Sequence, residues 1–390
     1  MQPQKIYIGG WFQRTTLHLS EIYDFLKNAS SPLDLDEAKL KKLQKDLKLA
    51  SVEMRVDNLE YIEATSDHGL TIKIFEDGLM MLGKDFKSLD EDIKILTGYY
   101  ESKLSVGLSY IFSLGAPVPK ELANIKNIYP YFLIFNNIDR EEIKKYLSYF
   151  KQEKYFEIIT PAFEIHRGGK LYVINNKSEK IENIERFIQE QIFLREFKGQ
   201  LHRYLNLHRI IWEKIADIKE RGEIKGSEIA AHKSKIEGYG KTINLIDARI
   251  SQMNTYIHTR ESIVKNSEEL TNFSSVLEYK YQTLVDTHDY VKDIWLMTKN
   301  YVESAQALFT NLLTESTGKS VRDLTIITSM GVGATLMGLL TQKALVITRG
   351  GLIYFLALLF IGYFSNKIVK AVNLNRNYKI KDVKFEKNIE

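Results

Sequence analysis

The sequence predicts an α+β protein in which a mixed N-terminal domain leads into long helices and then into a two-helix transmembrane hairpin. Segments typical of strands and of helices alternate over residues 1–176. All six prolines lie within the first 161 residues, so the remainder of the chain can form long unbroken helices. Two apolar runs lie close together at 324–364, and nothing else in the 390 residues has this character.

The first domain, residues 1–176, is expected to lie in the cytosol and to contain a sheet. The strand candidates alternate polar and apolar residues or form short apolar runs. The triplet Asp67-His68-Gly69 predicts a hairpin turn, and Asp139 is placed to cap a helix. We expect strands at 5–12, 59–64, 70–75, 78–82, 131–135, 155–160 and 170–174, and helices at 20–28, 35–49, 86–114 and 139–150.

The next two segments are predicted to be helical. Residues 177–240 form a connector, in which several glycines after residue 221 favour a turn between helices. Residues 241–323 form one long stalk helix, because apolar residues recur in steps of three and four, as in a coiled coil. An ordinary amphipathic helix that packs on its neighbour is the alternative interpretation. The positions of this seam are Ile246, Ile250, Met253, Ile257, Val264, Leu277, Tyr281, Leu284, His288, Val291 and Trp295.

Residues 324–369 are predicted to be two transmembrane helices, followed by a basic cytosolic tail at 370–390. An apolar run of this length nearly crosses a hydrocarbon core of about 30 Å as a helix. Lysines and arginines lie just before the first run and just after the second, and two more lie in the loop that joins the runs. This distribution of basic residues predicts a multi-pass protein of the inner (plasma) membrane with both termini cytoplasmic.

Composition and motifs argue against several functional classes. The chain has no cysteine, which excludes thiolate chemistry. Its net charge of +4 is too small to indicate direct binding of nucleic acid. The eight histidines form no metal-binding motif, so we assign no metal ligands. No catalytic constellation is visible, and we expect no enzyme activity and name no catalytic residue.

One face of the first apolar helix could line a pore. The candidate pore residues follow one another in steps of three and four and therefore share a helix face. Their hydroxyls and one amide could line a hydrated path, with the aliphatic side chains as constrictions. Alternatively, neighbouring glycines form a packing surface and the threonines bond back to their own helix. The candidate residues are Thr325, Thr328, Val332, Thr335, Leu339 and Gln342.

Two glycine-containing turns in the first domain are candidate ligand sites. Gly9 and Gly10 lie beside Trp11 and Arg14, on which a purine could stack and a phosphate could bind. A second turn offers Arg167 and Lys170 as partners for an anion. The alternative in both cases is a tight turn with an aromatic plug and solvated basic residues.

The layout of the chain resembles the CorA family of divalent-cation channels. The shared features are a mixed cytosolic domain, a stalk helix that leads into the first span, a second span and a basic tail. The run 324–327, Leu-Thr-Ile-Ile, is similar to the start of the family's first span, and Thr335 matches its in-span threonine. The resemblance implies a homopentamer in a lipid bilayer whose first spans line a pore.

The chain departs from the family at the outer mouth of that pore. The family's Gly-Met-Asn signature is replaced by Gln342, Lys343 and Ala344, and its in-span proline by Gly333. A ring of lysines would repel divalent cations. In lacking the motif the chain is similar to CorA-like effectors of type III CRISPR systems. That similarity implies an antiviral channel gated by a small nucleotide, a conjugate of S-adenosylmethionine and AMP.

Two further functions remain open on the sequence. One is transport of Mg²⁺ or another divalent cation through a divergent mouth. The other is a membrane-anchored coiled-coil protein that holds a partner.

Overall fold

A computed structural model gives the structure of the chain. It describes residues 2–13, 17–112, 128, 130–151, 153–154, 156–219, 221–340 and 349–380, without the side chains of 334, 336–340, 349–352, 354–355 and 358–359. The chain divides into two compact units. Unit 1 comprises Met1–Leu205 and Leu245–Lys292, and unit 2 comprises Asn206–Asn244 and Asp293–Glu390.

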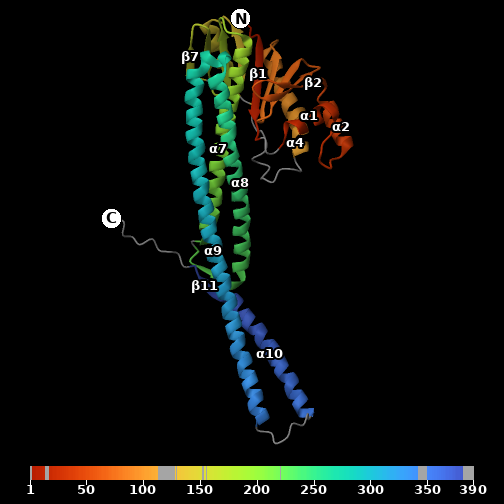
Figure 1. The fold of residues 1–390 in the computed structure, drawn as a ribbon, viewed down its shortest axis with the longest axis vertical. Coiled ribbons are helices and arrows are strands. Elements are labelled where there is room, and N and C mark those ends of the chain that lie inside the picture. Colours follow the sequence, from red (N-terminus) through yellow and green to blue (C-terminus); the bar gives the residue numbers. More distant parts are fainter. Residues whose placement is uncertain are drawn as a thin grey trace, which may run out of the picture. The chain divides into compact units, whose positions relative to one another are not determined.

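Unit 1 is built around a nine-stranded sheet with the order β2-β3-β4-β5-β1-β6-β9-β8-β7 (Figure 1). Only the pair β6–β9 is parallel among the described pairs, and a helix lies between these two strands in the chain. The strands are β1 (Lys5–Trp11), β2 (Leu49–Val56), β3 (Glu60–Ser66), β4 (Leu70–Phe75), β5 (Leu79–Asp85), β6 (Tyr131–Asn136), β7 (Phe156–Ile159), β8 (Phe163–Arg167) and β9 (Leu171–Asn176).

Short helices cover one face of this sheet and contribute to its core. Ile6 and Ile8 of β1 belong to one buried cluster with Ile22 and Phe25 of the first helix. The Asp139 carboxylate accepts a hydrogen bond from the Arg140 amide at 2.8 Å, which is part of the predicted cap. These helices are α1 (Leu19–Asn28), α2 (Glu37–Asp46), α3 (Leu89–Tyr99), α4 (Ser105–Phe112) and α6 (Arg140–Tyr149), with a π-helical turn at Tyr100–Leu104.

The long helices cover the opposite face of the sheet. Because side chains alternate along a strand, Lys5 and Tyr7 of β1 point away from Ile6 and bond to Glu185 of α7 (Ile181–Lys219). Gly9 is required at the next position on this face, since a Cβ there would lie 2.6 Å from the Ile192 side chain. Within unit 1, α8 (Gly226–Asn266) and α9 (Ser274–Leu340) contact α7 through Arg260 and Tyr281.

The stalk predicted as one helix at 241–323 is divided. α8 ends at Asn266, and a 3₁₀ turn at Glu268–Phe273 precedes α9. Phe273 stacks between Phe163 and Phe187, with ring centroids 4.3 and 4.6 Å apart, and so holds the turn against the sheet domain. The apolar seam itself is buried as predicted, from Ile246 to Trp295.

Unit 2 contains α10 (Arg349–Asn375), the adjoining parts of α7, α8 and α9, and a two-stranded ribbon. The ribbon pairs β10 (Glu223–Lys225) with β11 (Asn377–Lys379). The predicted turn after residue 221 is present, but α8 runs through Gly238 and Gly240, where the sequence suggested a looser chain. The Asn373 amide donates to Ser320 of α9 at 2.9 Å and fastens the end of α10.

The membrane prediction is not supported. In the part of the chain that the structure describes, no helix is both long enough and apolar enough to cross a bilayer. The apolar run after residue 324 forms the end of α9, a 67-residue helix that is charged over most of its length. In α10 the apolar run gives way to Ser365, Asn366 and Lys367. On this finding the transmembrane hairpin, and the multi-pass location in the plasma membrane with both termini cytoplasmic, are wrong; the α+β class is confirmed.

Candidate anion-binding site

The first predicted ligand turn is occupied by the protein's own side chains. Trp11 is buried, and its indole nitrogen donates to the Asp77 carbonyl oxygen at 2.8 Å. Its ring packs against Phe193, Phe197 and Tyr256. This arrangement corresponds to the aromatic-plug alternative and offers no open ring face for a purine. Arg14 lies outside the described residues.

The second predicted turn contributes one residue to a real cavity. Arg167 ends β8 and lines a cavity of about 350 Å³ in unit 1. Its guanidinium lies 5.1 Å from the centre of the Tyr172 ring on β9, which fixes its position. Lys170 is exposed in the turn between these strands and is not among the residues that line the cavity.

Helices α7 and α9 supply the rest of this cavity, which we call the cationic cavity. The contributing positions on α7 are spaced three and four residues apart and therefore share one face. On α9 the contributing positions are two adjacent pairs, one turn apart. The lining residues are Arg167, Tyr172, Gln191, Leu194, Arg195, Lys198, Tyr279, Lys280, Thr283 and Leu284.

Of the described side chains that line the cavity, four are cationic and none is a carboxylate. Burial, and then the positive charge of Arg167, lower the pKa of Lys280 to about 8. Burial also lowers the pKa of Arg195, although its ion pair with Glu196 opposes the effect. In both cases burial is the main cause, so these positive charges lie where water compensates them poorly.

Gln191 and Arg195 each bring to the cavity a buried donor that has no hydrogen-bond partner among the described residues. These donors are Nε2 of Gln191 and Nε of Arg195. Gln191 is only 3 % exposed, and its oxygen accepts a hydrogen bond from Lys280. A buried donor without a partner is costly, by about 1 to 3 kcal/mol. An acceptor inside the cavity would remove that cost.

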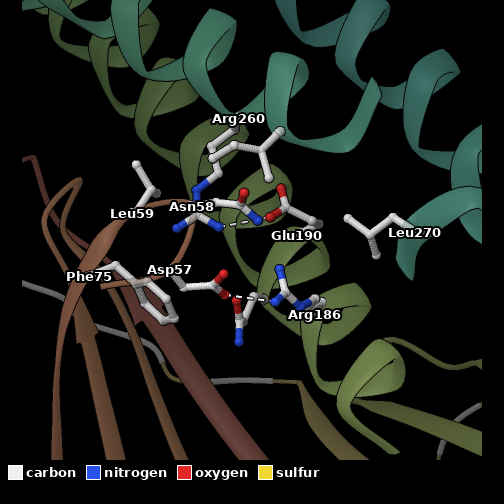
Figure 2. A pocket seen from close by; sticks show the side chains of 10 residues that line it. Asp57, Asn58, Leu59, Phe75, Arg186, Glu190, Arg260 and Leu270 are labelled. Carbon is white, nitrogen blue, oxygen red and sulfur yellow. Dashed lines mark hydrogen bonds and ion pairs between the residues drawn. The ribbon is translucent and has the colours of Figure 1, made fainter. Parts of the chain in front are cut away.

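A second, much smaller cavity of unit 1 is surrounded by ion pairs that support the fold (Figure 2). It measures about 20 Å³, room for a single water molecule. Figure 2 shows Arg260 paired with Glu190 and Arg186 paired with Asp57, at 2.8 Å in each case. Because its cations already face carboxylates, this cavity is not a site for an anionic ligand.

The predicted pore face forms part of a cavity in unit 2. Thr328, Val332 and Thr335 lie with residues of α10 around a volume of about 530 Å³. The hydroxyls of Thr325, Thr328 and Thr335 donate to carbonyl oxygens four residues earlier, at 2.5 to 2.8 Å. The threonines thus bond back to their own helix, as in the alternative interpretation. A pore on this face stays a prediction. The Leu339 side chain and the outer-mouth residues Gln342, Lys343 and Ala344 lie outside the described residues.

Comparisons with known proteins leave the family open. The chain matches no protein-family model and no curated protein. The resemblance to CorA proteins, the pentamer and the nucleotide ligand therefore stay predictions. In the described part of the chain, no group of three or more histidine, aspartate or glutamate side chains could hold a metal ion.

Sequence reasoning found only one of the cationic residues, Arg167. It missed Arg195, Lys198 and Lys280, because basic residues on a long helix usually belong to its solvated face, and it missed the uncharged Gln191 as well. A usable signal was present, since Lys280 directly precedes Tyr281 of the buried seam. A lysine beside a seam residue can be drawn into a cavity when a second element packs against that helix.

Proposed function

We propose that this protein is a sensor that binds a small phosphate-bearing ligand in the cationic cavity of unit 1. The supporting observation is a cavity of about 350 Å³ whose described lining includes four cationic side chains and no carboxylate. Its size lies in the range of roughly 300 to 1,000 Å³ that small-molecule sites occupy. Arginine in particular binds phosphate oxygens through paired hydrogen bonds.

A nucleotide is the ligand class that we propose. Arg195 and Lys280 supply positive charge for phosphate groups. Tyr279 is 74 % exposed at the edge of the cavity and can offer a ring to a base. An S-adenosylmethionine-derived nucleotide, as the sequence resemblance implies, belongs to this class.

Isothermal titration calorimetry with the phosphate-bearing ligands AMP, ATP and inorganic phosphate, and with S-adenosylmethionine and adenosine as ligands without phosphate, tests this function. We expect the phosphate-bearing ligands to bind and adenosine to bind at least tenfold more weakly, because charge-assisted hydrogen bonds contribute about 1.5 to 3 kcal/mol. Arg195→Gln should weaken binding by a similar factor. Arg55→Gln is the matched control, since Arg55 lies on β2 and pairs with Glu53 and Glu63.

Two results would contradict the proposal. One is the absence of binding for every phosphate-bearing ligand. The other is an Arg195→Gln variant that binds as tightly as the unchanged protein while Arg55→Gln does the same.

A second function is favoured by the apolar surface of unit 2. We infer that α10 associates with other copies of the chain, as the predicted pentamer requires. Six of its exposed apolar residues recur in steps of three and four and share one face, and contiguous surfaces of this kind mark binding sites. Gly331 and Gly362 line the neighbouring cavity and leave room for side chains of another copy. The six are Ile353, Leu356, Phe360, Phe364, Ile368 and Val372, and Ile361, Tyr363 and Leu374 are exposed as well.

Native mass spectrometry of the protein, purified with and without detergent, tests this association. We expect a homo-oligomer that Phe360→Glu dissociates, while Tyr290→Glu on an exposed site of α9 leaves it intact. A monomer under both conditions would show that this face is not covered by other copies.

A further inference from the structure

The inner end of the cationic cavity brings three hydrogen-bond donors together. Gln191 and Arg195 are four residues apart on α7, so their side chains are neighbours. The Lys280 ammonium reaches across from α9 and donates to the Gln191 oxygen. The remaining Gln191 donor and the Arg195 Nε are buried without partners among the described residues. A phosphate group has oxygen acceptors enough for all of them.

The groups that face Lys280 are cationic or uncharged. Arg167 approaches from β8, Tyr172 from β9, and Arg195 and Lys198 from α7. The Phe156 ring of β7 lies 5.7 Å from its nitrogen. Among the described residues no carboxylate lines the cavity, so none of those lining side chains compensates the charge of Lys280.

We infer that Gln191, Arg195 and Lys280 bind a phosphate dianion of the ligand and that Lys280 takes up a proton from solvent when this group enters. The inference rests on the proposed function and adds its regulation by pH. Lys280 provides the proton linkage because the other cations are two arginines, which keep their charge, and Lys198, which is exposed.

The direction of the linkage follows from the charges. In the free protein Lys280 has a pKa of about 8, so above pH 8 the neutral amine predominates. A dianion beside the amine favours its charged form and raises the pKa. Binding at pH 8.5 should therefore take up a fraction of a proton from solvent, and the affinity should fall as the pH rises above about 8. The ligand itself adds no proton change here, because a phosphate monoester has its second pKa near 6.

The test is calorimetry of AMP binding at pH 8.5 in two buffers whose ionisation enthalpies differ. The observed enthalpy should change between buffers by the amount that corresponds to proton uptake. Lys280→Arg should bind AMP within a fewfold of the unchanged protein and show no uptake, because arginine is already charged. Lys280→Met should bind at least tenfold more weakly at pH 7 and also show no uptake. Lys144→Met, a change at an exposed and paired lysine of α6, should preserve both affinity and uptake.

The outcomes separate this inference from the proposed function. AMP binding without proton uptake, or uptake that persists in Lys280→Arg, overturns the inference and leaves the cavity as a ligand site. No binding of AMP or inorganic phosphate at any pH between 6 and 9 overturns both.

Discussion

At the scale of single residues, Arg260 shows how unit 1 compensates a buried charge. Its Nε and Nη2 donate to both oxygens of Asp77, at 2.6 and 3.1 Å, and its Nη1 donates to Glu190 at 2.8 Å. The hydroxyl of Tyr281 donates to the other oxygen of Glu190. These hydrogen bonds connect the turn before β5 with α7, α8 and α9. Because each charge has a partner, this site supports the fold and has no capacity left for a ligand.

Arg260→Met should lower the free energy of unfolding by about 3 to 5 kcal/mol at pH 8, because it leaves two buried carboxylates without their cation. Burial already raises the pKa of Glu190, so the carboxyl can protonate in the variant as the pH falls. In urea unfolding, the loss in free energy of unfolding relative to the unchanged protein should accordingly be smaller at pH 5 than at pH 8. Arg55→Met, at an exposed arginine, should change stability by less than about 0.5 kcal/mol. A deficit that grows as the pH falls would contradict the account of the carboxylates.

Lys280 presents the opposite case, a half-buried cation that lacks a carboxylate. Lys280→Met should therefore raise the free energy of unfolding at pH 7 by on the order of 1 to 3 kcal/mol, even as it removes anion binding. Since the pKa of Lys280 is lowered to about 8, the unchanged protein sheds this charge at higher pH, and the advantage of the variant should narrow above pH 8. Urea unfolding at pH 7 and pH 9.5 measures both effects. A less stable Lys280→Met protein would mean that Lys280 is a structural residue.

At the scale of elements, the turn between α8 and α9 depends on one aromatic ring. Phe273 is 1 % exposed and stacks on Phe163 of β8 and Phe187 of α7. The turn contains neither glycine nor proline. Tertiary contacts, rather than a local breaking signal, therefore end α8. Their position also sets α9 against the sheet, where its residues complete the cationic cavity.

Phe273→Ala should cost about 3 to 5 kcal/mol of stability, the usual range for removing a buried phenylalanine. Hydrogen exchange should show the largest loss of protection in the turn and the first turns of α9. Tyr290→Ala, at a ring that is 59 % exposed on α9, serves as the control and should cost less than about 0.5 kcal/mol. Equal effects of the two substitutions would show that the stack does not anchor the turn.

Several elements could be predicted because their signals are local. The hairpin at Asp67-His68-Gly69 formed where expected, with Gly69 at a φ of +70°. Strand β2 was missed at 49–56, since its residues are largely exposed and lack a buried alternating face. The break after Asn266 was missed because it depends on Phe273 and on partners more than eighty residues away in the chain.

At the scale of the whole molecule, the candidate site could be predicted only in part. Arg167 was identified from its glycine turn, but its partners come from α7 and α9, which are more than 20 and more than 100 residues further along the chain. No short sequence motif indicates that residues so far apart in the chain come together in the fold. Conversely, the buried seam of α8 and α9 was predictable from its periodicity alone. The apolar run at 324–364 was interpreted as a membrane hairpin, an interpretation that the described helices do not support.

The most direct test of the central claim is an experimental structure determined with the phosphate-bearing ligand that binds most tightly in calorimetry. The account predicts density for a phosphate group at the inner end of the cationic cavity, within hydrogen-bond distance of Gln191, Arg195 and Lys280. A ligand bound elsewhere in the molecule, with this cavity unchanged from the free protein, would contradict it.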